Sequence, residues 1–318
     1  MSLDHAALRR RNSFLLVLTA WIWGIAFVAQ SAGGDAVGPY TFNCIRCIIG
    51  GFVLLPVIKL LGRLYPERRN NPRTGQGQRV SGWADRNLIA GGIACGTALA
   101  VGSNLQQLGL YFGSTAGKAG FLTACYILIV PVIGLFFHKK CGWNIWAGIA
   151  AAVAGLYLLC IHGDFFIQFS DLLLLLCALV FAVHIMLIDY FAVRVDGVRM
   201  ACIQFFVSGI LSAVPMFLID MKHSIDGIAA WMPALTAADA WIPILYAGVL
   251  SCGVAYTLQI IGQRGVNPTV ASLLMSLESV FSVLAGWVIL GEALSGREIL
   301  GCVMIFGAVI LAQLPVQK

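Results

Sequence analysis

The sequence predicts an all-α membrane protein in which ten transmembrane helices form two inverted five-helix repeats. Of its 318 residues, 60% are hydrophobic and only 11% are charged, a balance that excludes an ordinary soluble domain. The apolar residues gather in ten runs of about 20 residues, the length that an α-helix needs to cross a bilayer. Basic residues collect in the connections on one side of these runs, and the two halves of the chain share one order of spans.

The first half contains five of the spans and the long polar stretch of the chain. We place these spans at 13–32, 40–61, 87–110, 115–137 and 143–161. The first span follows Arg9, Arg10 and Arg11, a pattern also found in signal peptides, but its apolar run continues for about 18 residues and completes the repeat, so we expect it to be retained. After the second span comes 63–86, whose many Arg, Pro and Gly residues predict a cytoplasmic loop.

The second half repeats this order of spans. We place its five spans at 171–192, 198–219, 241–262, 268–290 and 297–315. The long connection of this half, 222–240, lies on the side that is poor in Lys and Arg. Trp231 and Trp241 favour a position for it at the membrane interface.

The distribution of charge predicts the orientation of the chain. All but four of the 20 Lys and Arg fall in connections on one side of the spans; Lys222 and Arg297 fall on the other side, and Arg46 and Lys118 lie within spans. Positively charged short loops stay in the cytoplasm. We therefore predict a multi-pass protein of the plasma or inner membrane with both termini cytoplasmic. The role of the basic residues in setting this orientation also explains the net charge of +6, so we expect no nucleic-acid partner.

The two halves also correspond residue by residue. A shift of 153 positions lays 91–162 over 244–315 without a gap, so that Gln106 meets Gln259 and Gly148 meets Gly301. Because five is an odd number, the second half enters the membrane with the opposite orientation. We therefore predict a first repeat at 1–162 and an inverted second repeat at 163–318. Two such halves can exchange conformations, which is typical of transporters that open a central site to each side in turn.

Three ionisable residues in the spans are candidate transport residues, because a charge at the centre of a membrane helix costs about 2.5–3.5 kcal/mol on insertion scales. Glu278 lies near the middle of the ninth span. It could lock two helices by a hydrogen bond, or face a cavity and hold a cationic solute group or a proton. Lys118 could extend to the outer interface or attract an anion at the mouth of a cavity. Arg46 could pair with a neighbouring helix or face an outer vestibule.

Uncharged polar residues in the spans give further candidates. His184, in the sixth span, could pack by a hydrogen bond or exchange protons with Glu278, since its ordinary pKa lies near neutrality. Gln106 and Gln259 could bind a solute or join helices. Aromatic side chains in the spans could also form a wall around a planar solute. The candidates for this wall are Trp21, Trp23, Phe27, Tyr126 and Tyr256.

Other patterns in the spans indicate packing. The ten cysteines are scattered through apolar segments, where Cys acts as a small hydrophobe, and Cys44 and Cys47 have no neighbouring His that would favour a metal. Small residues at four-residue spacing in the fifth and tenth spans let helix backbones approach closely. Examples are Gly148 with Ala152, Ala151 with Gly155 and Ala308 with Ala312. We assign these two spans to a scaffold or a dimer contact.

Three stretches resemble the drug/metabolite transporter superfamily, EamA type. They are Ser276–Ala312 with its Gly291-Glu292, Gly109–Phe137 with its fourth-helix pattern, and Trp21–Phe27 with its Trp-Gly-x-x-Phe pattern. Ser279 stands where that family usually has Pro, so a kink is not assured there. The resemblance implies a ten-helix carrier of amino acids, nucleobases or similar solutes, with a cavity lined by helices 1, 3, 4, 6, 8 and 9.

The predicted function is therefore a secondary transporter that moves a small metabolite by alternating access. The chain has no P-loop, so we expect coupling to a proton or another gradient and no cofactor. An intramembrane enzyme is the alternative from another class, although the serine in Phe206–Gly209 lacks the glycine and the partnered histidine of a nucleophile motif. A passive channel is a second alternative. The substrate, the direction of transport and the choice between monomer and homodimer stay open.

Overall fold

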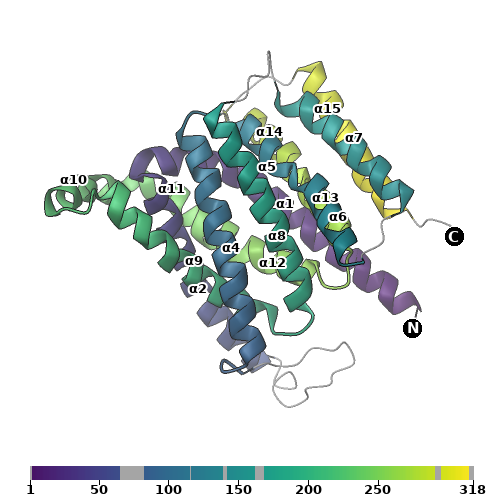
Figure 1. The fold of residues 1–318 in the computed structure, drawn as a ribbon, viewed down its shortest axis with the longest axis horizontal. Coiled ribbons are helices and arrows are strands. Elements are labelled where there is room, and N and C mark those ends of the chain that lie inside the picture. Colours follow the sequence, from purple (N-terminus) through teal and green to yellow (C-terminus); the bar gives the residue numbers. More distant parts are fainter. Residues whose placement is uncertain are drawn as a thin grey trace.

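The computed structural model describes residues 2–64, 82–114, 116–138, 142–161, 168–290 and 295–314. Within these ranges the chain is helical and has no strand, as the sequence predicts (Figure 1). Most of the predicted loop 63–86 lies outside the described residues. So does the predicted boundary between the repeats at 162 and 163.

The five spans of the first half follow the predicted order. They are α1 (Ser2–Val37), α2 (Pro39–Leu64), α4 (Arg86–Tyr111), the pair α5 (Ala116–Ala124) and α6 (Tyr126–Phe136), and α7 (Trp143–Cys160). The helix α1 begins well before the predicted start at residue 13. Its first turns are rich in Ala, Leu and Arg, which are good helix formers, so the helix extends beyond the apolar run.

The second half has the same five spans in more pieces. They are α8 (Phe169–Ala192), α9 (Gly197–Pro215) with the π-helix η1 (Met216–Asp220), then α11 (Ala238–Leu245) with the π-helix η2 (Tyr246–Ala255) and α12 (Tyr256–Gly262), then α13 (Pro268–Met275) with α14 (Leu277–Leu290), and α15 (Gly296–Gln313). The predicted interfacial connection forms a further helix, α10 (Ile225–Thr236), which extends to one side of the bundle in Figure 1.

Polar residues at the helix ends explain where several helices begin. Asp85, Asp196 and Asn267 each accept a hydrogen bond from a backbone N–H in the first turn of the helix that follows, and Ser295 forms a capping box with Glu298. These side chains satisfy N–H groups that have no partner inside the helix. The caps therefore fix the residues at which these helices begin.

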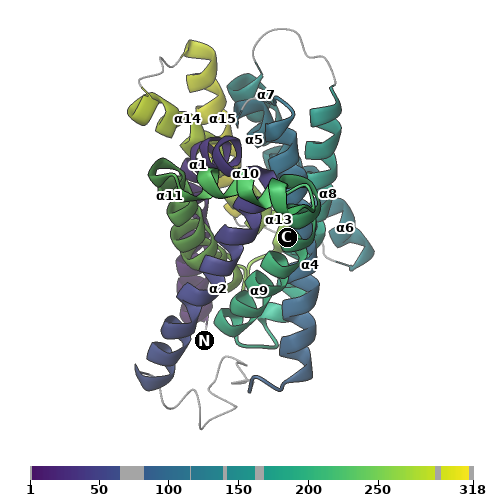
Figure 2. The same cartoon turned by 90° about the vertical axis from the view of Figure 1, so that its left-hand side faces the viewer.

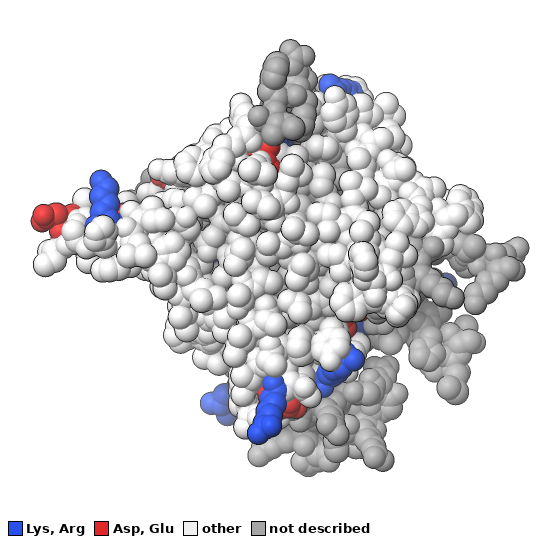
Figure 3. All heavy atoms as spheres, viewed as in Figure 1, with Lys and Arg blue, Asp and Glu red and all other residues white. Residues whose placement is uncertain are grey.

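The outer surface of the bundle is apolar. Many large hydrophobic side chains on the spans remain exposed, among them Phe14, Phe52, Val132 and Ile310. Eight of the described segments are long and apolar enough to cross a membrane, and α7 is a shorter apolar helix. Figure 3 shows a broad face almost free of charge, with Lys and Arg at its lower edge and other charges at its outer ends. This surface is suited to lipid, and the chain is a multi-pass membrane protein.

The fifth and tenth spans, α7 and α15, pack against each other as a pair at one side of the bundle (Figure 1). At Gly301, a Cβ atom would lie 2.6 Å from the carbonyl oxygen of Gly155, and at Gly148 it would lie 3.0 Å from that of Ala308. Under the 153-residue shift, Gly148 corresponds to Gly301 and Gly155 to Ala308. The two contacts are therefore counterparts of each other, and the crossing is itself close to two-fold symmetric. Within the described residues, the small-residue pattern serves packing inside one chain.

Two other spans are broken at corresponding places. The fourth span breaks at Cys125, between α5 and α6, and the ninth breaks at Ser276, between α13 and α14. Under the same shift, Cys125 corresponds to Glu278, so the breaks lie within two residues of each other. Ser276 Oγ donates to the carbonyl oxygen of Leu273 at 2.8 Å, a local bond that competes with regular helix geometry. The ninth span is therefore interrupted although Ser279 stands where the family usually has proline.

Candidate functional site

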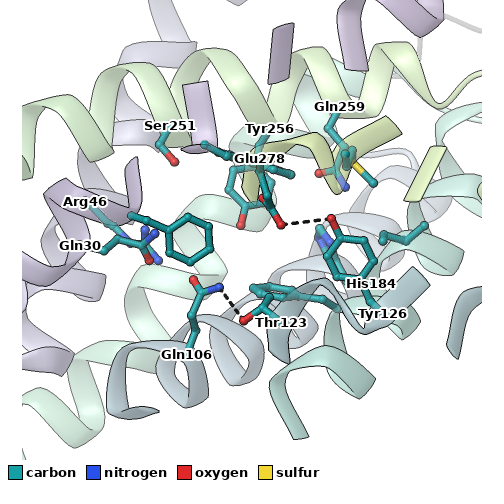
Figure 4. A pocket seen from close by; sticks show the side chains of 15 residues that line it. Gln30, Arg46, Gln106, Thr123, Tyr126, His184, Ser251, Tyr256, Gln259 and Glu278 are labelled. Atoms are coloured by element: carbon teal, nitrogen blue, oxygen red, sulfur yellow. Dashed lines mark hydrogen bonds between the residues drawn. The ribbon is translucent and has the colours of Figure 1, made fainter. Parts of the chain in front are cut away.

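A cavity lies between the two halves of the chain. Spans 1, 3, 4, 6, 8 and 9 all contribute side chains to it, and α2 adds Arg46. Its walls are formed by Trp23, Phe27, Gln30, Arg46, Gln106, Thr123, Tyr126, Phe181, His184, Ile185, Ser251, Tyr256, Gln259, Met275 and Glu278 (Figure 4). The mixture of aromatic and polar side chains in its walls is typical of small-molecule sites.

Glu278 and Tyr126 meet in this cavity. Tyr126 Oη donates a hydrogen bond to Glu278 Oε1 at 3.1 Å, and both side chains are buried (Figure 4). Each residue stands close to a helix break: Tyr126 directly follows Cys125, and Glu278 is the second residue after Ser276. The breaks in the two repeats thus bring a phenol and a carboxylate together across the cavity. Among transporters, interrupted helices commonly place polar groups at a central site.

Arg46 is the buried cation of the cavity. Its side chain is 3% exposed, and its guanidinium lies 5.4 Å from the centre of the Phe42 ring. Among the described residues Arg46 has no salt bridge, and its Nε has no hydrogen-bond partner. The pairing with a neighbouring helix that the sequence left open is not formed with any described carboxylate. The guanidinium is instead on the cavity wall (Figure 4).

His184 lies on the wall of the cavity but has a partner behind it. Its Nε2 is 3.2 Å from Gln204 Oε1 on α9, a contact in which the imidazole donates if Nε2 carries the proton. Its ring also packs edge-on against Tyr256, with 6.1 Å between the ring centres. His184 thus has a packing partner and also lines the cavity, and proton exchange with Glu278 stays a prediction.

The two repeat-related glutamines both reach the cavity. Gln106 Nε2 donates to Thr123 Oγ1 at 3.3 Å. Gln259 Oε1 is buried and has no hydrogen-bond partner among the described residues, and the same holds for Gln30 Oε1. A buried amide oxygen without a partner is costly, so both oxygens are placed to accept a hydrogen bond from a solute or from water.

Aromatic rings form much of the remaining wall. The Trp23 and Tyr256 rings are stacked at a tilt with 4.6 Å between their centres, and Phe27 lines the same cavity. Trp21 does not join them. Its side chain is 49% exposed, because a position two residues from Trp23 is turned by about 200° around the helix. The aromatic wall predicted from the sequence is therefore corrected at Trp21, which faces outward.

Lys118 lies away from the cavity. Its Nζ forms a salt bridge with Asp171 Oδ2 at 2.6 Å, and this oxygen also accepts the backbone N–H of Gln168 in the capping box of α8. Lys118 is near the start of α5 and Asp171 near the start of α8, so the pair joins two helix ends. Lys118 is therefore not among the residues that line the cavity, and its charge has a buried carboxylate beside it; a role in solute binding stays a prediction.

Sequence reasoning missed several cavity residues that carry no charge. They are Gln30, Thr123, Phe181, Ile185, Ser251 and Met275. Ser and Thr are frequent in membrane helices, where they form hydrogen bonds to their own backbone or to neighbouring helices. Nothing in the sequence therefore separates Thr123 and Ser251 from the other Ser and Thr residues of the spans. Gln30 stands near the C-terminal end of the predicted span 13–32, and only the fold shows that it faces the cavity.

Among the described residues, the candidate serine of the enzyme alternative has no histidine among its hydrogen-bond partners. Ser208 is buried, and its neighbour is Cys47, with 3.5 Å between Sγ and Oγ. No cluster of three or more His, Cys, Asp or Glu among the described residues is arranged to hold a metal ion. In the described part of the chain, the cavity lined by Glu278 and Arg46 is therefore the strongest candidate for a functional site.

Comparisons with known proteins agree with the fold. The model of the EamA-like transporter family matches twice, at residues 11–161 and 168–314. A protein of Archaeoglobus fulgidus described as an uncharacterized transporter is 28% identical over 302 residues, covering 95% of this chain and 85% of its own length. One of Methanothermobacter thermautotrophicus with the same description is 24% identical and covers 97% and 88%. A solved crystal structure matches with a TM-score of 0.72 and 18% identity over 95% of both chains, which shows a shared fold.

Proposed function

The chain belongs to the EamA-like transporter family, and we propose that it is a secondary carrier that moves one small solute through the central cavity by alternating access. The observation that supports this most directly is the meeting of Glu278 and Tyr126 at two corresponding helix breaks. A carboxylate enclosed between the halves can be reached from either side only if the halves move. A small change in helix bend at the two breaks would supply such a movement.

The two halves act as the moving parts in this proposal. Residues 1–162 and 163–318 rock against each other, while the two-fold contact between α7 and α15 stays closed at one side. No described side chain of these two helices lines the cavity. Their role is therefore to hold the halves together during the movement.

We further propose that Glu278 couples the movement to a proton. The carboxylate alternately holds a proton and a contact to the solute, and Tyr126 Oη keeps it oriented in both states. A group that binds one partner at a time can exchange a proton on one side of the membrane for a solute on the other. His184, bonded to Gln204 on the same cavity wall, is placed to assist without being the primary proton carrier.

The proposed location is the plasma or inner membrane, with both termini in the cytoplasm. The basic residues at the connections support this orientation through the positive-inside rule. The chain functions as a monomer or a homodimer.

Counterflow in proteoliposomes tests the proposal. A thermal-shift screen of the purified protein against amino acids, nucleobases and vitamins first identifies a ligand, because a ligand that binds the folded state raises the melting temperature. Vesicles preloaded with that ligand should then accumulate labelled ligand transiently above equilibrium, and uptake should saturate. Flux without saturation or counterflow would indicate a channel, and chemical conversion of the ligand would indicate an enzyme.

A further inference from the structure

We propose that the cavity selects a zwitterionic solute, whose anionic group pairs with Arg46 and whose cationic group pairs with Glu278. The proposal rests on the carrier function proposed above and names the charge class of its substrate. It is carried by two opposite charges that line one cavity without forming a salt bridge to each other.

Arg46 provides the anion-binding end. Its guanidinium is buried on the cavity wall, forms no salt bridge with a described residue, and has an unpartnered Nε. A buried cation without a counterion is unfavourable, since the lost hydration is not replaced. A planar guanidinium matches a carboxylate with two parallel hydrogen bonds, so a carboxylate of the solute is the partner that fits best.

Glu278 provides the cation-binding end. Tyr126 Oη occupies one of its carboxylate oxygens, and no described residue donates to the other. Figure 4 shows Arg46 and Gln30 together at one end, and Glu278 and Tyr126 farther along the cavity. The tilted rings of Trp23 and Tyr256 stand on the same wall, and aromatic faces attract an ammonium group.

The balance of charge decides between the possible solute classes. The cavity holds one described cation and one described carboxylate, with no other Lys, Arg, Asp or Glu among its lining residues. A purely anionic solute would satisfy Arg46 and leave Glu278, in its deprotonated state, with a neighbour of the same sign. A purely cationic solute would do the reverse. A zwitterion satisfies both ends and brings no net charge into the membrane interior.

Neutral polar groups in the cavity extend this recognition. Trp23 Nε1 is a buried donor without a partner, and Gln30 Oε1 and Gln259 Oε1 are buried acceptors without partners, among the described residues. An ammonium group carries more donors than one carboxylate can accept, so an amide oxygen such as that of Gln259 can take another. These groups would orient the two ends of the solute and would not by themselves select its charge.

The test compares solutes that share a skeleton and differ in charge. The purified full chain is titrated with 2-aminohexanoate, 6-aminohexanoate, hexanoate and hexylamine, and with 4-(aminomethyl)benzoate, 4-methylbenzoate and 4-methylbenzylamine, while its melting temperature is recorded. At least one zwitterion should bind about tenfold more tightly than both singly charged analogues. Arg46→Gln should remove the advantage of the zwitterion over the amine, and Glu278→Gln its advantage over the carboxylate.

Matched variants separate this selection from loss of structure. Arg86→Gln and Asp35→Asn remove exposed charges of the same two types, and neither should change the order of affinities. Arg46→Lys keeps a charge, and should retain part of the preference if Arg46→Gln is poorly folded. The melting temperature of each variant without ligand reports its folding.

Equal affinities for the three charge classes, tighter binding of a singly charged analogue, or no shift with any zwitterion at millimolar concentration would overturn the proposal. So would a wild-type order of affinities in Arg46→Gln. Saturable counterflow of an uncharged or singly charged solute would leave the carrier function standing without zwitterion selection. Zwitterion binding without counterflow would instead contradict the carrier function.

Discussion

The candidate role of Glu278 depends on where the fold places its side chain. The sequence indicates a carboxylate near the middle of a span, and the structure adds that it stands beside a helix break, faces a cavity and accepts a hydrogen bond from Tyr126. Arg46 gains its meaning in the same way, from the absence of a described salt-bridge partner on its cavity wall. The roles proposed for both residues lead to predictions for single substitutions.

Glu278→Gln should abolish gradient-driven uptake and the pH dependence of transport while the protein stays folded. The amide can still accept the hydrogen bond from Tyr126, but it cannot take up or release a proton. Uptake into proteoliposomes with and without an imposed pH gradient measures the effect, with Asp35→Asn as the control at an exposed acid. Uptake and pH dependence like those of the wild type would remove Glu278 from the mechanism.

Gln259→Leu should reduce the apparent affinity for solute by about tenfold, the equivalent of one lost hydrogen bond of about 1.4 kcal/mol. It should not lower the melting temperature, because the amide oxygen that it removes is buried without a partner among the described residues. Gln263→Leu is the matched control, since Gln263 is also buried with an unpartnered amide oxygen but does not line the cavity. An equal loss of affinity in both variants would contradict a role for Gln259 in solute binding.

Residues with unusual chemistry for a membrane span could be selected from the sequence. Glu278, Arg46, His184, Gln106 and Gln259 all reach the cavity, because polar groups inside apolar helices usually face protein or water. Lys118 met the same criterion and lies elsewhere, since the sequence could not show that Asp171 is its partner. Ser251 and Thr123 could not be selected, as their residue types are common in spans.

At the scale of elements, the pair α7–α15 and the broken spans have separate tasks. Close contact between α7 and α15 depends on glycines whose missing side chains admit the facing backbone. The breaks in spans four and nine instead give up helical hydrogen bonds near the cavity. In each repeat, close packing thus involves the last span, and the helix break lies in the span before it.

Gly301→Ala should destabilise the protein by about 1–3 kcal/mol, because its new methyl group would lie 2.6 Å from the carbonyl oxygen of Gly155. Gly307→Ala, on the same helix, should leave the stability unchanged or raise it, since no atom lies within 4 Å of the added carbon. Melting temperatures of the two variants in detergent give the comparison. A similar change in both variants would show that the α7–α15 crossing tolerates a wider separation.

The spans could be located from the sequence because apolar length and loop charge are strong signals in membrane proteins. Their interruptions could not. A helix break at Cys125 or Ser276 involves no proline at the break itself, and the π-helix η2 lies within a continuous apolar run. Such departures from regular helix depend on packing against other spans, which a pattern of hydrophobic residues does not specify.

At the scale of the whole molecule, the family match repeats along the chain and the fold places one cavity between the two matching parts. The apolar outer face and the charged ends describe a body that sits across a bilayer (Figure 3). Figure 2 shows the same bundle from the side of α10, with α2 and α9 running past each other between its two ends. The orientation of this bundle across the membrane can be tested directly with fused reporters.

A reporter that is active only in the cytoplasm should be active when fused after Leu314, and inactive when fused after Lys222. A reporter that is active only outside should give the opposite result. The basic connections predict this outcome through the positive-inside rule. Cytoplasmic activity at Lys222 would reverse the proposed topology and assign the basic loops to the outside.

The central claim is that the cavity opens to each side of the membrane in turn, and side-specific labelling of Ser251→Cys tests it most directly. Ser251 is buried on the cavity wall, so a thiol there can be alkylated only when the cavity is open. Labelling above the wild-type background by a membrane-impermeant reagent should occur in right-side-out and in inside-out vesicles, and a bound solute should slow it. Labelling from one side alone, with no change on adding solute, would contradict alternating access.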